Sequence, residues 1–283
     1  MATQTIIITG STQGLGFGYA REFLRRGHNV IVSGRDPSRV QSSIARLAAE
    51  FPGSEARIAG TACDVSRLSS VQALWDFGAV RFGHIDIWLN NAGFARTGAQ
   101  FADNTADEIE TMVRSNVIGS INAAQVAVAG FKRQASGNCG GGKLYLTLGG
   151  GGASGRVVPG MTVYSTTKRA VKYLTDCLVR ERNEERDESM LIGTISPGIN
   201  ITEGLIREMR ALPAERRAKA LRQLSFIGEH VETTTSWIVE RVLADKKQGN
   251  DITWLTTGRM VGRVFSMLFG SRRNFLSRYS FES

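Results

Sequence analysis

Short β-rich runs alternate with longer amphipathic stretches along most of this chain, and this alternation constrains the fold more than any other feature. The β-rich runs cover residues 4–9, 29–33, 57–62, 85–90, 143–148, 191–196 and 252–256. The helical stretches cover residues 15–27, 37–51, 67–82, 105–134, 161–186 and 233–245. Alternation of this kind is typical of βαβ units on a parallel sheet, and nearly continuous apolar runs such as Ile6–Ile8 indicate strands that are buried on both faces. We therefore predict an α/β fold, a doubly wound parallel seven-stranded sheet with helices on both faces.

The length of 283 residues suits one large α/β domain and is too short for two generous ones. We predict a single domain over residues 1–258, which contains at residues 203–230 a basic helical insertion that acts as a substrate lid. Residues 259–283 form a basic and apolar C-terminal extension.

The cysteines and the N-terminus bear on the compartment. Cys63, Cys139 and Cys177 are odd in number and widely spaced, which favours a reducing environment and indicates no metal site. No signal or transit peptide precedes the first strand, and no stretch is long and apolar enough to cross a bilayer. We expect a cytosolic protein, or an organellar protein whose targeting segment has been removed.

A glycine-rich turn joins the first strand to the first helix. It consists of Gly10, Ser11, Thr12, Gln13, Gly14, Leu15 and Gly16. Glycines allow the backbone to approach a pyrophosphate closely, and the N-terminus of the following helix offers N–H groups and a favourable dipole to an anion. Because strand, turn and helix occur in this order at the start of an α/β chain, the turn predicts a dinucleotide site.

The end of the second strand bears on the choice of dinucleotide. Sites that prefer NAD usually have an acidic residue here, which binds the ribose hydroxyls. This chain has Ser33, Gly34 and Arg35 instead. The guanidinium of Arg35 suits a 2′-phosphate, so we predict NADP(H); the alternative is a solvated arginine at the start of a helix.

Two further polar segments follow buried strands. Asp64 and Val65 follow the third strand, and Asn91, Ala92 and Gly93 follow the fourth. The carboxyl ends of parallel strands meet at one edge of the sheet, where such folds bind ligands. We expect both segments to line the cofactor site.

Tyr164 and Lys168 lie four residues apart on the helix after the fifth strand, and hence on one face of it. A free tyrosine has a pKa of about 10, which is too high for ready proton exchange near neutral pH. A nearby cation favours the phenolate and lowers that pKa. We predict that Tyr164 acts as the general acid of a carbonyl reduction, or as the base of the reverse oxidation.

Over roughly residues 3–257 the chain resembles the short-chain dehydrogenase/reductase family. The matching elements are the glycine-rich turn, the NNAG tetrad that ends at Gly93, Asn116, the Tyr164–Lys168 motif, and Ser196-Pro197-Gly198 followed by Thr202. The resemblance implies a Rossmann fold with the strand order 3-2-1-4-5-6-7. It also implies that Tyr164 protonates the carbonyl oxygen, that Lys168 binds the nicotinamide ribose, and that Asn116 holds a relay water. Asp64 would contact the adenine, and the cofactor would be lined by Asn91, Ala92, Gly93, Pro197, Gly198, Ile199 and Thr202.

One departure from the family pattern concerns the serine that binds the substrate oxygen, about thirteen residues before the tyrosine. Counted back from Tyr164, this position is Gly151; counted from the fifth strand, it is Gly149. Ser154, or the backbone N–H groups of Gly149 to Gly152, would then replace the missing donor as in an oxyanion hole.

Glycine at this position and the segment Ile252–Leu276 resemble the chlorophyll b reductases of plants and cyanobacteria. That resemblance implies NADPH-dependent reduction of the 7-formyl group of chlorophyll(ide) b to hydroxymethyl, in a bacterial or cyanobacterial cytoplasm, at a membrane periphery, or in a plastid. The alternatives are a reductase of another apolar or lipid-like carbonyl compound and a catalytically weak, regulatory NADP(H)-binding protein.

The net charge of +9 is concentrated in residues 206–224 and 259–283. In the second segment apolar residues such as Val261 and Phe265 alternate with arginines, which suits peripheral contact with a membrane that holds an apolar substrate. The alternative is that the apolar residues cover the core or a partner subunit. We expect no nucleic-acid binding, since no recognition motif accompanies the charge. The family resemblance also implies a homo-oligomer that packs through the helices at 105–134 and 161–186.

Overall fold

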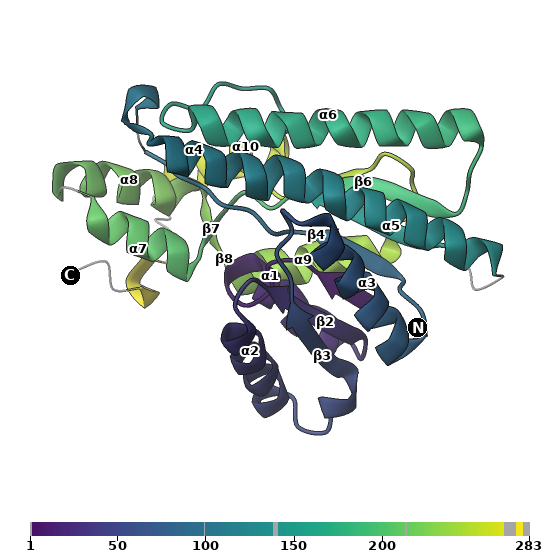
Figure 1. Ribbon diagram of the computed structural model, residues 1–283. Helices are drawn as coiled ribbons and strands as arrows, with labels where there is room; N and C mark the ends of the chain where they lie inside the picture. Colours follow the sequence, from purple (N-terminus) through teal and green to yellow (C-terminus); the bar gives the residue numbers. More distant parts are fainter. Residues whose placement is uncertain (1, 99, 138–140, 213, 269–275, 280–283) are drawn as a thin grey trace.

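A parallel sheet of seven strands forms the centre of the computed structural model, which describes residues 2–98, 100–137, 141–212, 214–268 and 276–279 (Figure 1). Its strands are β1 (Thr5–Ile8), β2 (Asn29–Gly34), β3 (Ile58–Ala62), β4 (Ile87–Asn90), β5 (Gly142–Thr147), β6 (Met190–Ser196) and β9 (Asp251–Thr253). Their order is β3-β2-β1-β4-β5-β6-β9, and every pair is parallel. This is the predicted order, so the doubly wound fold is confirmed.

Helices cover both faces of the sheet. They include α1 (Gly14–Arg25), α2 (Pro37–Glu50), α3 (Leu68–Phe82), α4 (Ala106–Val113), α5 (Gly119–Ser136), α6 (Thr162–Glu185) and α9 (Val231–Ala244). Single 3-10 turns lie at Glu55–Arg57, Phe101–Asp103 and Leu276–Arg278. These helix bounds agree closely with the predicted ranges, except that the predicted helix at 105–134 is divided.

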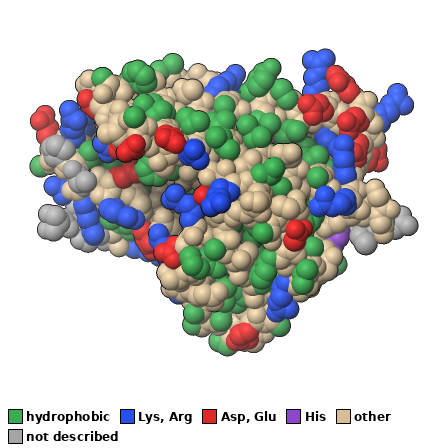
Figure 2. All heavy atoms as spheres, viewed as in Figure 1, with side chains coloured by type: hydrophobic (Ala, Val, Ile, Leu, Met, Phe, Trp, Pro, Cys, Tyr) green, Lys and Arg blue, Asp and Glu red, His purple; other side chains and the backbone are tan. Residues whose placement is uncertain are grey.

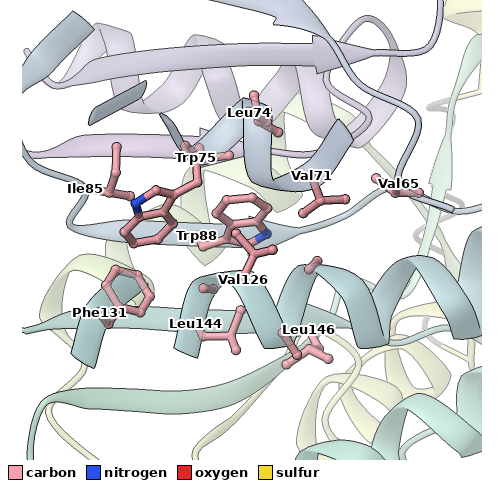
Figure 3. Close-up of a cluster of buried hydrophobic side chains, with 14 of the residues drawn as sticks. Val65, Val71, Leu74, Trp75, Ile85, Trp88, Val126, Phe131, Leu144 and Leu146 are labelled. Carbon is pink, nitrogen blue, oxygen red and sulfur yellow. The ribbon is translucent and has the colours of Figure 1, made fainter. Parts of the chain in front are cut away.

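The run of isoleucines in β1 explains why the strands are apolar throughout. Ile6 and Ile8 belong to the core on the side of α1 and α9, whereas Ile7 belongs to the core on the side of α3 and α5. Because successive side chains of a strand point to opposite faces, a strand between two helical layers has no polar side. On the α3 side, Trp75 stacks on Trp88 with 6.0 Å between ring centroids and meets the edge of Phe131 (Figure 3).

A π-helical turn at Arg114–Ile118 divides the predicted helix 105–134 into α4 and α5. Such turns insert an extra residue and are frequent at functional sites. Here the turn carries Asn116, whose side chain is fully buried and hydrogen-bonds outside its own helix. We predicted one continuous helix because the apolar positions before the turn and those after it each have helical spacing when taken separately.

The predicted insertion at 203–230 contains α7 (Glu203–Ala211), α8 (Ala214–Ile227) and β8 (Gly228–His230). β8 pairs in parallel with β7 (Ile199–Ile201) in a small second sheet, which the sequence did not predict. Ile201, Met209 and Leu224 form a separate apolar cluster beneath α7 and α8. The insertion therefore has its own packing centre beside the main sheet.

The C-terminal segment forms α10 (Thr257–Leu268), and its arginines contact the protein rather than solvent alone. Arg259 lies over the rings of Trp237 and Trp254, at 4.3 and 3.7 Å from their centroids. Arg263 donates hydrogen bonds to the carbonyl of Ile227 and to Glu229 Oε2, both at 2.9 Å. These two cations hold α10 against α9 and the base of the insertion. Arg272 and Arg273 lie outside the described residues.

Candidate active site

Tyr164 lies in the first turn of α6, and Lys168 follows one turn later on the same side of the helix. Lys168 is 4% exposed, and its Nζ donates a hydrogen bond of 2.9 Å to the carbonyl of Thr147, the last residue of β5. The same Nζ lies 5.9 Å from the centroid of the Tyr164 ring. The structure thus brings the two predicted residues together at the carboxyl end of β5.

Burial shifts the pKa values of both groups toward their neutral forms. It raises the pKa of the Tyr164 phenol to about 12, with a further contribution from the charge of Glu208, and it lowers the pKa of Lys168 to about 8. We expected the lysine cation to lower the pKa of the phenol, and this expectation is wrong for the protein by itself, because burial raises that pKa. Tyr164 is therefore held as a proton donor at neutral pH.

Asn116 joins three segments around this pair. Its Nδ2 donates to the carbonyl of Phe94 and to Thr167 Oγ1, both at 2.9 Å, and its Oδ1 accepts from the Phe94 N–H at 2.8 Å. An added Cβ at Gly93 would lie 3.0 Å from Asn116 Oδ1 and 3.4 Å from Lys168 Nζ. Asn116 therefore holds the segment after β4 beside α6; its part in a proton relay stays a prediction.

Gly149 is the glycine that faces the phenol. An added Cβ at Gly149 would overlap the Tyr164 hydroxyl and lie 2.7 Å from its Cζ. At Gly151, by contrast, the backbone has a φ of +78° and the added Cβ would meet the Arg156 carbonyl at 2.6 Å. The position counted from the fifth strand is thus the one that borders the reacting phenol.

Among the described residues, no hydrogen bond joins Ser154 to the phenol of Tyr164. Ser154 is exposed, and its hydroxyl accepts a 3.2 Å hydrogen bond from the Arg156 N–H. Within the same loop, the Gly152 N–H donates to the Gly149 carbonyl at 2.8 Å. Of the predicted backbone donors, Gly149 to Gly152, the Gly152 N–H is therefore engaged within the loop and Gly149 borders the phenol, and replacement of the serine by this backbone stays a prediction.

The glycine-rich turn packs directly against the segment after β4. Gly10 has a φ of +64°, and an added Cβ there would lie 2.8 Å from Ala92 Cα. Asn91 Nδ2 donates to the carbonyls of Thr9 and Gly10, at 3.0 and 3.2 Å. Only glycine permits this approach, since both the positive φ and the short distance exclude a side chain.

The start of α1 is suited to an anion. Its N-cap residue, Gln13, makes no side-chain capping hydrogen bond, so the helix N-terminus is not closed by its own sequence. An added Cβ at Gly16 would lie 2.7 Å from Asn91 Nδ2, so no side chain can occupy the turn there. The turn fits the pyrophosphate of a dinucleotide.

Ser11 and Ser33 are buried behind this turn. The Ser11 hydroxyl donates to the Ile8 carbonyl at 2.7 Å and accepts from the Ser33 N–H at 2.9 Å. The Ser33 hydroxyl also donates to the Ile8 carbonyl, at 3.1 Å. These hydroxyls hold the turn against β2, and their predicted contact with the cofactor stays a prediction.

Two arginines lie beyond the end of β2. Arg35 lines a hollow of about 330 Å³, which is also lined by Ala62, Cys63, Asp64, Arg67, Ser69 and Ser70. An added Cβ at Gly34 would lie 2.8 Å from Thr12 Cγ2, so an acidic side chain has no room at this position. Arg39, which the sequence analysis missed, donates to Gln13 Oε1 at the glycine-rich turn. The sequence feature that could have indicated Arg39 is that it is a second arginine, four residues after Arg35.

The remaining predicted cofactor residues lie along the same edge. Asp64 Oδ1 accepts from the Ser66 N–H and hydroxyl, at 3.0 and 2.8 Å, which shapes the turn after β3. Val65 packs on α5 where Gly119 leaves room, since an added Cβ there would lie 2.6 Å from Val65 Cγ2.

Residues Pro197 to Thr202 approach the turn from the other side. Thr202 caps α7, its Oγ1 accepting from the Leu205 N–H at 3.2 Å. An added Cβ at Gly14 would lie 3.2 Å from Thr202 Cγ2, so the residue just before the insertion borders the dinucleotide turn. Gly198 has a φ of +72°, and the Pro197 carbonyl accepts from Asn200 Nδ2 at 2.8 Å.

Glu208 on α7 is a further residue of this site that sequence analysis missed. Its Oε2 accepts a 2.9 Å hydrogen bond from the hydroxyl of Thr97, in the segment after β4. Burial raises the pKa of its carboxyl, while Thr97, Arg96 and Arg207 lower it to a smaller extent. No local motif marks Glu208, because only the fold of the insertion brings it to the site.

The rim of the site includes exposed apolar side chains. Phe94, which follows Gly93 and is bonded through its backbone to Asn116, is 37% exposed, and Val157, in the loop between Gly149 and α6, is 93% exposed. Both loops contain residues that border Tyr164 or Lys168. The entrance is therefore suited to an apolar ligand.

Comparison with known proteins places the chain among dehydrogenases. The sequence pattern of the family described as short chain dehydrogenase matches residues 4–210. Chlorophyll(ide) b reductase NOL, a chloroplastic protein of Oryza sativa subsp. japonica, is 30% identical over 275 residues, which cover 95% of this chain and 76% of the relative. The probable chlorophyll(ide) b reductase NYC1 of Arabidopsis thaliana is 30% identical over 271 residues, which cover 91% of this chain and 52% of the relative. Among solved structures, levodione reductase has a similar fold, with a TM-score of 0.78 at 23% identity over 92% of this chain and 99% of that one.

Proposed function

Because the chain belongs to the short-chain dehydrogenase family, and is thus an oxidoreductase, we propose that it is an NADPH-dependent reductase of a large hydrophobic carbonyl substrate. The first candidate reaction is reduction of the 7-formyl group of chlorophyll(ide) b to hydroxymethyl. The observation that carries this proposal is Gly149 beside the phenol of Tyr164, in a chain whose relatives from rice and Arabidopsis are named chlorophyll(ide) b reductases.

Hydride and proton have separate sources in this mechanism. NADPH, when bound, supplies the hydride to the carbonyl carbon. Tyr164 donates its phenolic proton to the carbonyl oxygen as the C–O double bond becomes single, and burial keeps that proton in place at neutral pH. Lys168, fixed by the Thr147 carbonyl, stabilises the phenolate that remains. The backbone N–H groups of Gly149 to Gly151 are proposed to orient the carbonyl oxygen.

The residues along the sheet edge are proposed to hold the dinucleotide. The glycine-rich turn and the start of α1 would hold the pyrophosphate, and Asn91 to Gly93 with Pro197 to Thr202 would line the nicotinamide half. Asp64 and Val65 would border the adenine. Arg35 would bind the 2′-phosphate, and Arg39 lies within reach of the same turn through Gln13.

Glycine at position 149 supports a rigid and bulky substrate. A formyl group is attached directly to the planar ring and conjugation favours its lying in the ring plane, so the ring edge must come close to Tyr164. A side chain at Gly149 would occupy the space next to the phenol. The exposed side chains of Phe94 and Val157 supply apolar surface for such a ring at the entrance.

The proposal is tested by incubating the purified protein with NADPH and chlorophyll b and separating the pigments. We expect 7-hydroxymethyl chlorophyll to accumulate as NADPH is consumed. If NADPH binds but no pigment is converted, a panel of apolar aldehydes and ketones, including lipid-like ones, distinguishes the two alternatives. Turnover of a panel member indicates a reductase of another substrate, and no turnover at all indicates a regulatory NADP(H)-binding protein.

Replacing Arg35 with Ala is expected to raise the KM for NADPH at least tenfold and to change the KM for NADH less than twofold. A charge-assisted hydrogen bond to a phosphate is worth about 1.5–3 kcal/mol, and NADH has no 2′-phosphate. Steady-state kinetics with both cofactors measure the effect. Arg180→Ala, at an exposed arginine on α6, is the matched control. Equal losses with NADPH and NADH would contradict a phosphate contact.

We further propose that the protein is a homo-oligomer that makes peripheral membrane contact. Val113, Ile118 and Ile121 on α4, its π-helical turn and α5, and Tyr173 on α6, are exposed on the long helices expected at the subunit interface. Figure 2 shows hydrophobic side chains spread over the upper part of the molecule, where Figure 1 draws these helices.

Membrane contact is supported by the exposed side chains of Val261 and Phe265 on α10. No described helix has both the length and the apolar character needed to cross a bilayer. Because the rice and Arabidopsis relatives are named as chloroplastic, a plastid is the first proposed location, and a bacterial or cyanobacterial cytoplasm is the alternative.

A further inference from the structure

The insertion at residues 203–230 borders the candidate active site along α7. Glu208 Oε2 on α7 accepts a 2.9 Å hydrogen bond from the hydroxyl of Thr97, in the segment after β4. Thr202, which caps α7, lies where an added Cβ at Gly14 would meet its Cγ2 at 3.2 Å. The position of α7 therefore sets one wall of the site.

The apolar cluster that supports the insertion is small. Its buried members among the described residues are Ile201, Met209 and Leu224, and Ile201 belongs to β7, before the insertion begins. The clusters on the two faces of the main sheet are far larger. Because apolar burial stabilises in proportion to the area removed from water, α7 and α8 depend on further contacts to stay in place.

The end of the chain supplies part of those contacts. Leu276 and Tyr279 pack against the same cluster. Figure 1 draws the turn at Leu276–Arg278 in yellow beside α7. A hydrogen bond of 2.7 Å also joins the Tyr279 hydroxyl to Nδ1 of His230, the last residue of β8. Residues from the C-terminus thus complete the packing of the insertion.

Arg263 on α10 closes the C-terminus of α8. The last carbonyl groups of a helix have no partners within the helix, and a cation there also interacts favourably with the helix dipole. Arg263 Nη1 donates to the carbonyls of Phe226 and Ile227, at 3.2 and 2.9 Å. Its Nη2 donates to Glu229 Oε2 at 2.9 Å, and the two side chains are only 11% and 9% exposed. α8 is therefore anchored to α10 by a largely buried ion pair and by its own terminal carbonyls.

We propose that α10 and residues 276–279 form a C-terminal brace that holds the insertion in place beside the active site before a substrate binds. Arg263, Leu276 and Tyr279 are its positioning residues. All of their contacts named above lie within the chain, so none of these contacts depends on a ligand. The brace acts on the substrate only through α7 and α8, and this effect on the substrate rests on the proposed function.

The brace matters for binding because an insertion that is already in place need not be ordered by the substrate. The apparent affinity of a ligand falls in proportion to the fraction of molecules that are competent to bind it. Loss of the brace lets α7 and α8 leave the sheet edge more often, and the wall beside Thr97 is then absent in part of the population.

Amide hydrogen exchange of the full-length protein without ligands, followed by mass spectrometry, tests the brace directly. Leu276→Ala removes an apolar contact, and Tyr279→Phe removes only the hydroxyl that is bonded to His230. We expect the slowest amides of α7 and α8 to exchange about fivefold faster in Leu276→Ala and about threefold faster in Tyr279→Phe. Amides of α2, at the opposite end of the sheet beside β3, are expected to stay within about twofold of the wild type.

Leu68→Ala on α3 and Tyr173→Phe on α6 make the same chemical changes at exposed residues and are expected to leave exchange in α7 and α8 unchanged. Wild-type exchange of α7 and α8 in Leu276→Ala would overturn the inference, and so would equal acceleration in α2, which indicates a loss of global stability. If Leu276→Ala does not fold, Tyr279→Phe, which keeps the ring, decides on the same terms.

A kinetic measurement tests the consequence for the substrate. With both anchors removed, in Arg263→Gln combined with Leu276→Ala, the KM for the carbonyl substrate is expected to rise about threefold or more, while kcat changes less than about twofold. Arg180→Gln combined with Leu68→Ala is the matched control at exposed positions. Faster exchange in α7 and α8 with an unchanged KM would refute the effect on substrate binding. Because the exchange measurement needs no substrate, failure of the wild-type protein to reduce chlorophyll b would refute the proposed reaction alone.

Discussion

Replacing Tyr164 with Phe is expected to lower kcat/KM for carbonyl reduction by about three orders of magnitude. The substitution removes the hydroxyl that supplies the proton and keeps the ring that packs at the start of α6. Burial raises the pKa of this phenol to about 12, so the wild-type group is fully protonated at neutral pH and its loss removes the whole acid contribution. Rates of NADPH consumption with the accepted carbonyl substrate measure the effect.

Two control measurements distinguish a loss of proton transfer in Tyr164→Phe from a loss of cofactor binding or of folding. NADPH affinity, measured by fluorescence titration, is expected to change less than twofold, because the cofactor contacts proposed for the turn and for Arg35 are intact. Tyr173→Phe removes a phenol from the exposed side of the same helix and is expected to have wild-type activity. Activity of Tyr164→Phe within tenfold of the wild type would mean that another group supplies the proton.

Replacing Gly149 with Ser, which restores the residue usual in the family, is expected to lower kcat/KM by about two orders of magnitude. An added Cβ there would overlap the Tyr164 hydroxyl and lie 2.7 Å from Cζ, so the phenol must move away from the carbonyl. A misplacement of about 1 Å at a reacting group can cost about 100-fold in rate. The same serine would also fill the space that the proposed ring substrate needs.

Gly149→Ala separates the effect of bulk from that of the hydroxyl, and both variants are expected to lose activity. Gly262→Ser makes the same chemical change on α10, where an added Cβ has nothing within 4 Å, and is expected to behave as wild type. If Gly149→Ser reaches or exceeds wild-type activity while Gly149→Ala does not, the hydroxyl is useful at this position and the proposed reason for the glycine is wrong.

Some features of the site depended on contacts that no local pattern reveals. The sequence identified Tyr164, Lys168 and Asn116 through motifs, and the structure places all three around the end of β5 and the segment after β4. It did not reveal Glu208 or Arg39, since a charged residue on an amphipathic helix looks the same whether it faces solvent or a neighbouring loop. Two alignments of the missing serine stayed open until the structure placed Gly149, and not Gly151, against the phenol.

The C-terminal extension is a second case in which a local sequence pattern did not reveal the contacts. Its alternation of arginines with apolar residues suggested either a membrane-facing or a core-covering segment. In the structure Arg259 lies over Trp237 and Trp254, and Arg263 binds Glu229, so these arginines hold α10 to the body of the protein. The contact between Arg259 and Trp237, which lies on another helix, cannot be inferred from composition alone.

The sequence by itself determined the seven strands of the main sheet, the helices between them and the sheet edge that carries the site, but not the small second sheet or the π-helical turn. Strand burial, turn glycines and helix periods are local properties, because they depend on backbone geometry and on which faces of each element meet the core. Only the tertiary structure decided that Gly149, from the loop before α6, borders the phenol, and that Glu208 of α7 binds Thr97 in the segment after β4. The physical reason is that proximity between distant segments arises from how the insertion packs on the sheet edge, and that packing is set by the sum of many contacts rather than by any one motif.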